Sequence, residues 1–417
     1  MNLALMGGTA VRTRPFPSWP QSEKEERDSL LEVLDSRSWG GYSSKVTEFE
    51  EAFASLHQAK HGVCCSNGTV ALEVALRAIG ITCGDEVIVP PFTFVATATA
   101  VLLCHGCPVF VDIDPNSFCL SPAAVEAAIT PRTRAIIAVH FAGHPADMDA
   151  LSSIAEKHGV ALVEDAAHAH GAVWSGKSVG TFGIAAAFSF QGFKLMTGGE
   201  GGIVLTNSSE VADNVWSYCN QGRRRGGTWY EHFTLGTNYR ITGFQAAVLR
   251  EQLKRLLGQI ATRSDNVNYF RERLRFFPGI VLPDNDARVD RHPYYLLTLR
   301  YDSSLFGGVD RDVVIQALRA EGIPVQPTYP HPLYRNPLFQ SSRPPSCRSG
   351  SWQTAQHYES LHLDEAERIC RDGMWLEQNL FLGGHGDIDD VLEAFEKVKE
   401  FSPALLDCPQ VAGMPRA

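Results

Sequence analysis

The first half of the chain alternates short apolar runs with segments whose apolar residues recur at helical spacing. The apolar runs predict strands at residues 86–89, 108–112, 135–140 and 160–164. The segment before each of these strands predicts a helix, at 68–78, 93–103, 121–128 and 148–158. Strands that are apolar on both faces and alternate with helices indicate a mostly parallel sheet covered on both sides. Ligands of such sheets bind at the carboxyl ends of the strands.

The pattern is different at the two ends of the chain. Residues 1–20 are rich in Pro, Gly and Arg and predict an extended arm, which must lie on its own chain or on a partner. An amphipathic helix predicted at 244–263 leads to a region of mixed strands and helices, whose polar stretch 341–365 we expect to be irregular. We therefore predict an α/β protein with an arm (1–20), a large domain (21–263) and a small C-terminal α+β domain (264–417).

Charge excludes one class of partner. The chain carries 37 basic and 47 acidic residues, a net charge of −10, whereas a nucleic-acid-binding protein usually has a basic face. The short run Arg223–Arg225 is flanked by glycines and suggests an anion-contacting or solvated loop. No segment has the pattern of a signal peptide or a membrane span, so we expect a cytoplasmic protein with neither nucleic-acid nor membrane partners.

The ten cysteines have no framework spacing and are interpreted mainly as buried thiols in a reducing compartment. Cys104 and Cys107 form a lone CxxC motif, for which a redox or zinc role must be weighed. No second pair follows at zinc-site spacing, and the motif leads directly into a predicted strand. We therefore predict no metal site.

One stretch, FSFQGFKLMTGGEGGIVLTN (188–207), places Lys194 between two predicted strands among four glycines. A buried lysine is costly unless its amine has a use. One use is a Schiff base, because desolvation lowers the lysine pKa and makes the amine nucleophilic. A hairpin with a surface lysine is an equally open interpretation of this stretch alone.

Two other features belong to the same predicted edge of the sheet. Gly68 and Thr69 open a helix directly after a strand, which makes an anion site, although an ordinary helix cap explains them as well. Asp165 ends a strand, where a buried helix cap is the alternative. With Ser189 as a further phosphate ligand, these residues and Lys194 are the parts that pyridoxal phosphate needs: a lysine for the imine, an acid for the ring nitrogen and a nest for the phosphate. The dinucleotide-binding pattern GxGxxG does not occur.

Five motifs together resemble the DegT/DnrJ/StrS-type sugar aminotransferases, which are pyridoxal-phosphate enzymes of fold type I, like aspartate aminotransferase. The motifs are SNGTVALEVAL, PPFTFVATA, VEDAAHAHGA, FSFQGFKLMTGGEGG and GTNYRITGFQAAVLREQL. The resemblance covers about residues 8–400. It implies a homodimer with shared active sites.

The resemblance also implies roles for single residues. Lys194 would form the internal aldimine and carry the proton, with pyridoxamine phosphate as intermediate, and Asp165 would hold the ring nitrogen. The other implied cofactor ligands are Gly68, Thr69, Phe94, His168 and Ser189, with Asn238 reaching the other subunit's phosphate. For Phe94 alone core packing is the favoured explanation, and for His168 a core or supporting histidine is equally open. Tyr239 and Arg240 would bind substrate, Arg240 through the amino-acid carboxylate in the other subunit's site.

The variants DAAHAHGA and FSFQ..KLMT are similar to the subgroup of 3-amino-5-hydroxybenzoate synthases and glutamine-dependent inosose aminotransferases. Many sugar-nucleotide members have Gln where this chain has His168. Tyr329, His331 and Tyr334 are candidates to face a hydroxylated ring, or simply surface-loop residues.

The leading hypothesis is a transaminase that moves an amino group from L-glutamine or L-glutamate to a ketone of a cyclitol or sugar in antibiotic biosynthesis. Two alternatives are other enzymes with the same cofactor: a dehydratase-aromatase of the aminohydroxybenzoate type and an aminotransferase for nucleotide-linked keto-sugars. A third, from a different class, is a non-enzymatic cofactor-binding regulator. A redox protein would require exposed, reactive Cys104 and Cys107.

Overall fold

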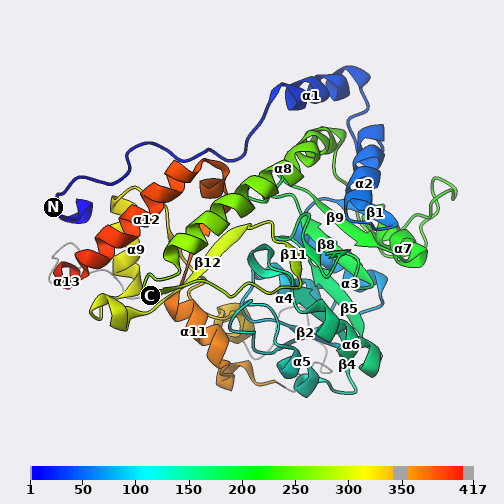
Figure 1. The fold of residues 1–417 in the computed structure, drawn as a ribbon. Helices are drawn as coiled ribbons and strands as arrows, with labels where there is room; N and C mark the ends of the chain where they lie inside the picture. Colours follow the sequence, from blue (N-terminus) through cyan, green and yellow to red (C-terminus); the bar gives the residue numbers. More distant parts are fainter. Residues whose placement is uncertain (1, 341–355, 407–417) are drawn as a thin grey trace.

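The computed structural model describes residues 2–340 and 356–406 and contains a large sheet, a smaller sheet and the helices packed on them (Figure 1). The large sheet has the strand order β1-β9-β8-β5-β4-β2-β3. Its strands are β1 (His61–Cys65), β2 (Glu86–Val89), β3 (Cys107–Phe110), β4 (Thr133–Val139), β5 (Ala161–Asp165), β8 (Ala185–Ser189) and β9 (Gly202–Thr206). Only β9 runs antiparallel to its neighbours. The carboxyl ends of β1, β5 and β8 therefore meet at one edge of the sheet.

Helices cover both faces of the large sheet, as the apolar runs predict. Alternate residues of one strand, such as Ile136 and Ile137, belong to the cores on opposite faces. The first face is covered by α3 (Gly68–Ala78), α4 (Ala96–Leu103) and α7 (Ser209–Cys219). The second face is covered by α2 (Ser44–Leu56), α5 (Pro122–Ala128), α6 (Met148–His158) and the first part of α8 (Gly243–Leu274).

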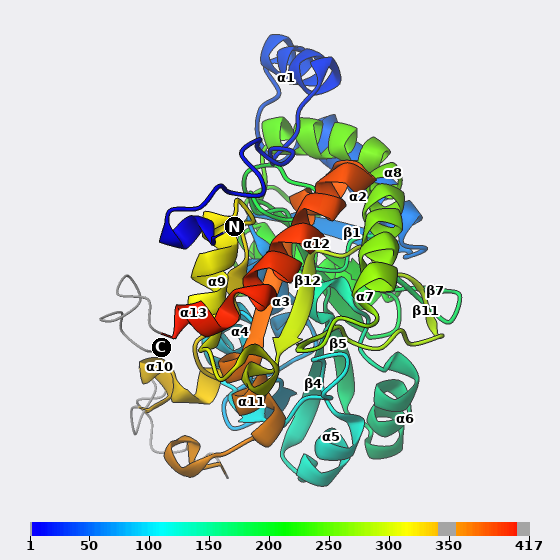
Figure 2. The same ribbon diagram turned by 60° about the vertical axis from the view of Figure 1, so that its left-hand side comes forward.

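The smaller sheet is antiparallel, with the order β10-β12-β14-β13. Its strands are β10 (Ile280–Val281), β12 (Leu296–Tyr301), β13 (Gln326–Pro327) and β14 (Gly373–Glu377). The second part of α8 packs on it with α9 (Arg311–Ala320) and α12 (His385–Glu400) (Figure 2). A third, short sheet joins β11 (Val289–Arg291) to β6 (Val173–Trp174) and β7 (Lys177–Ser178). The remaining helices are α1 (Lys24–Ser36), α10 (Pro337–Gln340), α11 (Asp364–Asp372) and α13 (Ser402–Leu405).

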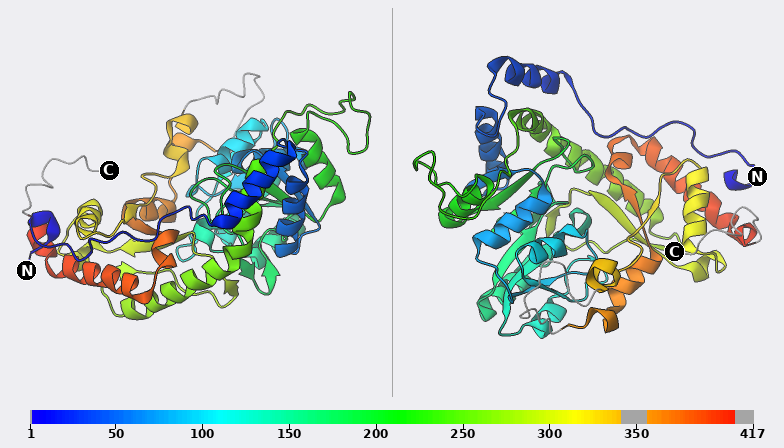
Figure 3. Two further views of the ribbon diagram at one scale, coloured as in Figure 1. Left: turned by 90° about the horizontal axis from the view of Figure 1, so that it is seen from above. Right: turned by 180° about the vertical axis from the view of Figure 1, so that it is seen from behind.

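The N-terminal arm lies on its own chain, one of the two expected alternatives. It runs beside the small sheet's helices and then crosses to α1, which packs on α8 (Figure 3). The buried carboxylate of Glu321 accepts hydrogen bonds from the backbone N–H groups of Ala4 (2.8 Å) and Val11 (3.1 Å). Arg12 pairs with two aspartates of α12, Asp387 at 2.9 Å and Asp390 at 2.6 Å.

Three expected boundaries need correction. The helix expected at 93–103 begins only at Ala96, so Phe94 lies in the turn before it. Helix α8 continues to Leu274, past the expected division at residue 263, and that domain division stays a prediction. Of the stretch 341–365, residues 341–355 lie outside the described part, and α11 begins at Asp364 inside the segment expected to be irregular.

Candidate active site

A cavity of about 930 Å³ opens where the carboxyl ends of β1, β5 and β8 face the small sheet. Nine of the residues predicted from the sequence line it: Gly68, Thr69, Phe94, Asp165, His168, Ser189, Lys194, Tyr239 and Tyr329. These residues come from segments up to about 260 positions apart in the chain. A second cavity of about 490 Å³, lined by His144, Arg271 and His292 among others, contains none of them.

Lys194 lies in the connection between β8 and β9, which pair as the antiparallel hairpin that the sequence predicts. Its backbone N–H donates to the carbonyl of Gln191 (2.9 Å), and its Nζ lies 4.6 Å from the centre of the Tyr295 ring. Burial lowers the pKa of the Lys194 amine to about 8, against the opposing charge of Asp165. The amine is therefore partly neutral near physiological pH and is able to act as a nucleophile.

Asp165 is buried at the end of β5, and burial raises its pKa above the usual value. Four interactions act against that rise, one of them the charge interaction with His140. The Thr97 hydroxyl donates to Oδ2 (2.8 Å), the backbone N–H of Ala167 donates to Oδ1 (3.2 Å), and Lys194 attracts the negative charge. The Thr97 hydroxyl lies 3.0 Å from that of Thr93. A buried carboxylate held in this way can keep a cationic ring nitrogen protonated.

The N-terminus of α3 forms an anion cradle. Asn67 caps the helix by accepting the backbone N–H of Val70 (2.9 Å), whereas the N–H groups of Gly68 and Thr69 have no acceptor among the described residues. Gly68 packs so closely on Ser189 that a Cβ added to it would lie 2.6 Å from the serine Cβ. Backbone donors, the helix dipole and the serine hydroxyl thus converge, as phosphate binding requires.

His168 is a neutral histidine in the wall of the cavity. Burial and the charge of Lys194 lower its pKa well below the usual value. Its Nδ1 accepts the backbone N–H of Ala142 (3.3 Å), so that Nε2 carries the proton. The imidazole stacks on Tyr295, with ring centres 4.3 Å apart. The two rings form a flat surface next to Lys194.

Phe94 and Tyr239 lie at the open side of the cavity. Phe94 is 59% exposed, so the interpretation as core packing is wrong and a stacking role stays a prediction. The Tyr239 hydroxyl lies 3.5 Å from Glu73 Oε2.

Four predicted residues do not line the cavity of their own chain. Asn238 is exposed, and Arg240 is half-buried with Nη1 3.3 Å from Asn220 Oδ1. His331 is half-buried beside Pro332. Tyr334 is a correction: it is fully buried, and its hydroxyl donates to Glu367 (2.6 Å) and accepts the N–H of Leu363 (3.2 Å). Because the hydroxyl already donates one hydrogen bond and accepts another within the core, Tyr334 is not placed to bind substrate.

The sequence did not reveal Thr97, Tyr295, Trp19 and Gln378 as site residues. Trp19 belongs to the arm and donates its indole N–H to the carbonyl of Gly192 (3.1 Å), which closes one side of the cavity. Tyr295 and Gln378 come from the small sheet and from the turn that follows β14. Thr97 belongs to the motif PPFTFVATA, but only the tertiary fold brings its hydroxyl to Asp165 and the other three residues to the cavity.

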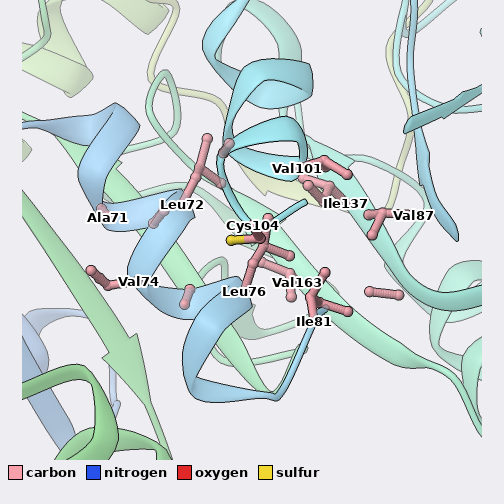
Figure 4. Packing of buried hydrophobic residues seen from close by; sticks show 14 of the residues in the cluster. Ala71, Leu72, Val74, Leu76, Ile81, Val87, Val101, Cys104, Ile137 and Val163 are labelled. Carbon is pink, nitrogen blue, oxygen red and sulfur yellow. The ribbon is translucent and has the colours of Figure 1, made fainter. Parts of the chain in front are cut away.

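The structure contradicts the redox interpretation of Cys104 and Cys107. Both side chains are 1% exposed, and Cys104 lies among Leu76, Ile81 and Val163 (Figure 4). Its thiol contacts the carbonyl of Glu73 (3.4 Å), and burial raises its pKa to about 12. A thiol with this pKa is not a reactive thiolate at neutral pH.

Within residues 2–340 and 356–406, no three or more His, Cys, Asp or Glu side chains gather as metal ligands. The same residues include no helix with the length and apolar character needed to cross a bilayer.

Residues 20–396 match the DegT/DnrJ/EryC1/StrS aminotransferase family, and the chain belongs to that family. A protein of Streptoalloteichus tenebrarius named "Putative L-glutamine:3-amino-2,3-dideoxy-scyllo-inosose aminotransferase" is 42% identical, over 97% of this chain and 99% of that protein. The L-glutamine:2-deoxy-scyllo-inosose aminotransferase of Streptomyces lividus is 37% identical, over 95% and 97% of the two chains. A crystal structure of 3-amino-5-hydroxybenzoic acid synthase superposes with a TM-score of 0.85 at 34% identity, covering 95% of this chain and all of that chain. The predictions of the family, of an aminotransferase and of fold type I are confirmed.

Proposed function

We propose that this aminotransferase moves the amino group of L-glutamine or L-glutamate to a ketone of a scyllo-inosose-type cyclitol in the biosynthesis of an antibiotic. One observation carries the proposal. A buried lysine with a pKa of about 8 shares a cavity with a buried carboxylate and an anion cradle. The inosose aminotransferases from two actinomycetes, which match almost the whole chain, support the choice of substrates.

The residues present fit pyridoxal phosphate. The phosphate would lie at the Gly68–Thr69 turn and Ser189, where a side chain at position 68 would fill the space. Asp165 would face the ring nitrogen, and Lys194 would hold the aldehyde carbon. His168, Tyr295 and Phe94 would pack against the faces of the pyridine ring of the cofactor. When bound, the group supplies an electron sink for the carbanion that forms on loss of a substrate proton.

The chain's own residues supply the proton chemistry. The amine of Lys194 would take up the proton from the substrate Cα and later give it back, because its pKa of about 8 suits both directions near neutral pH. The hydrogen bonds from Thr97 and Ala167 favour the charged form of Asp165, which would stabilise a protonated ring nitrogen. Trp19 helps to shield the reacting atoms from water.

A homodimer is part of the proposal. The loop at residues 222–237 presents Trp229, Tyr230, Phe233 and Leu235 to solvent, with exposures of 45–89%. A second copy would cover these apolar side chains. Asn238 and Arg240, which follow the loop, would then reach the partner's cavity. The cytoplasmic location stays a prediction.

The test is the visible spectrum of purified protein loaded with pyridoxal phosphate, before and after addition of L-glutamine. We expect the long-wavelength absorbance to bleach to the pyridoxamine phosphate spectrum, and then to return on addition of a keto-cyclitol such as 2-deoxy-scyllo-inosose. Absence of bleaching with both L-glutamine and L-glutamate would contradict the proposal.

The likeness to 3-amino-5-hydroxybenzoic acid synthase favours a second candidate, a dehydratase-aromatase that uses the same lysine. Its product is aromatic. New ultraviolet absorbance from an aminodehydroquinate-type substrate, without consumption of an amino donor, would identify that activity.

A further inference from the structure

The amine of Lys194 contacts the ring of an aromatic side chain. Its Nζ lies 4.6 Å from the centre of the Tyr295 ring, within the distance at which the negative face of an aromatic ring attracts a cation. Among the described residues, Nζ has neither a hydrogen-bond acceptor nor a carboxylate at ion-pair distance, and the charge of Asp165 acts from farther away. Tyr295 is therefore the partner that the structure gives to the charged form of this amine.

The Tyr295 ring is held in place by its surroundings. It directly precedes β12, whose first residue, Leu296, pairs in register with Glu377 of β14. The imidazole of His168 stacks on the ring, with 4.3 Å between the ring centres and 29° between the ring planes. His168 is itself fixed, because its Nδ1 accepts the backbone N–H of Ala142 (3.3 Å). A ring anchored in this way presents a pre-organised surface to the amine.

Tyr295 meets the amine as a neutral ring and not as an anion. Burial raises the pKa of its hydroxyl above the usual value, and the charge of Glu377 raises it further. The hydroxyl therefore stays protonated at neutral pH. The attraction then comes from the electrons of the ring face, and it is stronger where water is excluded.

The other titratable groups around Lys194 add one charge that favours its ammonium form. Burial, together with the charge of Lys194, lowers the pKa values of His168 and His170 well below the usual value, so both are neutral. Burial raises the pKa of Tyr329, which is neutral as well. Within the described part of the chain, Asp165 is the one carboxylate whose charge raises the pKa of Lys194. The remaining carboxylates that line the cavity are Glu73, Glu200 and Glu377.

Asp165 has a second task in the proposed reaction. When pyridoxal phosphate is bound, its carboxylate would face the cationic ring nitrogen, so that less of its charge acts on Lys194. The amine that takes up the substrate proton becomes an ammonium in a buried site, which burial disfavours. The ring of Tyr295 then remains as the partner of this ammonium.

We propose that Tyr295 is a positioning residue for Lys194, and that its ring face stabilises the ammonium between uptake of the substrate proton and its return. The neutral amine gains little from the ring, so the contact favours one of the two charge states. This inference rests on the proposed function for the proton transfer, whereas the contact itself is testable without cofactor or substrate.

The experiment measures the charge state of Lys194 in the apoenzyme. The protein is labelled with a trace of acetic anhydride over a range of pH, and peptide mass spectrometry gives the labelled fraction at Lys194, because only the neutral amine reacts. Wild type is compared with Tyr295→Phe, which keeps an aromatic ring, and with Tyr295→Leu, which does not. The control is Tyr269→Leu outside the cavity, since Tyr269 stacks on His385 (4.2 Å between ring centres) and lies 5.4 Å from the Arg273 guanidinium.

We expect Tyr295→Leu to lower the pKa of Lys194 by about 0.5 to 1.5, the equivalent of a cation–π contact in a site that excludes water. Tyr295→Phe and Tyr269→Leu should leave that pKa within about 0.3 of the wild-type value. The direction of the change separates two roles of the ring. If the ring only excluded water, the smaller leucine would admit water and raise the pKa toward the ordinary 10.5.

A second series of variants does not depend on the folding of Tyr295→Leu. Phenylalanine, monofluorophenylalanine and trifluorophenylalanine at position 295 keep the shape of the ring, while fluorine withdraws electrons from its face. The pKa of Lys194 should fall with each added fluorine. A raised or unchanged pKa in Tyr295→Leu, an equal fall in Tyr269→Leu, or no trend with fluorination would overturn the inference.

Failure of the proposed function would be seen in a different measurement. If wild-type protein loaded with pyridoxal phosphate does not bleach with L-glutamine or L-glutamate, that function is removed, whatever the labelling shows. Normal bleaching combined with an unchanged Lys194 pKa in Tyr295→Leu would overturn this inference alone.

Discussion

The pKa of the Lys194 amine is set mainly by two opposing effects. Burial favours the neutral amine, and the nearby charge of Asp165 favours the ammonium. Burial dominates, and the pKa falls from 10.5 to about 8. The neutral amine is the form that attacks an aldehyde, and its fraction rises as the pH rises through the pKa.

The first prediction follows for the apoenzyme. Its rate of pyridoxal phosphate capture should rise with pH to half its maximum near pH 8. Asp165→Asn should move this midpoint to lower pH, because the charge that favours the ammonium is gone. Stopped-flow absorbance measures the rate, and Lys194→Ala should show no capture. A wild-type midpoint near 10.5, the value of an ordinary lysine, would contradict the argument.

The second prediction concerns Thr97, whose hydroxyl lowers the pKa of Asp165 against the effect of burial. Thr97→Val should raise that pKa, so that the carboxylate is protonated at higher pH. The acidic limb of the kcat profile should therefore move to higher pH, and kcat at pH 7 should fall about tenfold. Lys194 and His140 also stabilise the carboxylate and should preserve part of the activity. Thr97→Ser should restore the profile. Thr99→Val on the same helix is the control, and an equal loss there would mean a general packing defect.

At the residue scale, the sequence reveals the groups that belong to local motifs. Lys194 and Asp165 follow apolar strands, and their chemistry is visible from their neighbours. Thr97 is one threonine on a helix of small residues, and only the fold places its hydroxyl 2.8 Å from Asp165. Tyr334 shows the opposite error. Its hydroxyl suggested a contact with substrate, whereas its ring packs in the core.

At the scale of elements, α3 and β8 contact each other so closely at Gly68 and Ser189 that a larger side chain at position 68 does not fit. An alanine Cβ at position 68 would lie 2.6 Å from the Ser189 Cβ, far inside normal contact distance. The third prediction is that Gly68→Ala weakens pyridoxal phosphate binding about 10- to 100-fold by moving the cradle apart. Titration of the apoenzyme measures the affinity.

The control for this variant is Gly258→Ala in the middle of α8. An added Cβ there meets no atom within 4 Å. It should leave cofactor affinity unchanged and stabilise the fold by about 0.5–1 kcal/mol, the difference in helix propensity, seen as a raised melting temperature. Equal losses of cofactor affinity in both variants would rule out the steric explanation.

The fourth prediction concerns the end of α4 and the start of β3, where Cys104 and Cys107 are buried. A thiol reagent applied to native protein should label exposed Cys83 and leave these two unmodified until denaturant is added. Peptide mass spectrometry identifies the labelled sites. Rapid native labelling of Cys104 or Cys107 would reopen the redox interpretation.

Helices and strands that bury many apolar residues could be predicted from the sequence, whereas those that bury few could not. The strands of the large sheet are apolar along their length and could be recognised from the sequence. Helix α11 buries only Ala366, Ile369 and Cys370, too few positions for its periodicity to stand out in a polar stretch. Strand β14 was missed as well, although its last residue, Glu377, lines the cavity.

At the scale of the whole molecule, strand–helix alternation is sufficient to predict the fold class, but not how the two sheets come to share a site. The cavity exists because α8 spans both sheets and the arm passes across its side. Contacts such as Glu321 with Ala4 join residues 317 positions apart and have no local signal. The same holds for residues that would act in another subunit.

Arg240 is predicted to act in another subunit, and its substitution tests that prediction. Its guanidinium is 5.1 Å from the centre of the Tyr42 ring, and the residue does not line the cavity of its own chain. If it binds the donor's carboxylate in the partner's site, Arg240→Ala should raise KM for L-glutamine and lower kcat/KM about 10- to 100-fold. Steady-state kinetics with varied L-glutamine measure this loss.

The fifth prediction is complementation between the inactive Lys194→Ala variant and the impaired Arg240→Ala variant. In a dimer of one Lys194→Ala chain and one Arg240→Ala chain, one site lacks both residues and the other has both. Half of the dimers in an equal, fully exchanged mixture are of this kind, so activity should recover to about a quarter of wild type. Co-expression with two affinity tags isolates the mixed dimer, whose activity per dimer should be about half of wild type. Mixed dimers no more active than Arg240→Ala alone would place Arg240 outside the shared site.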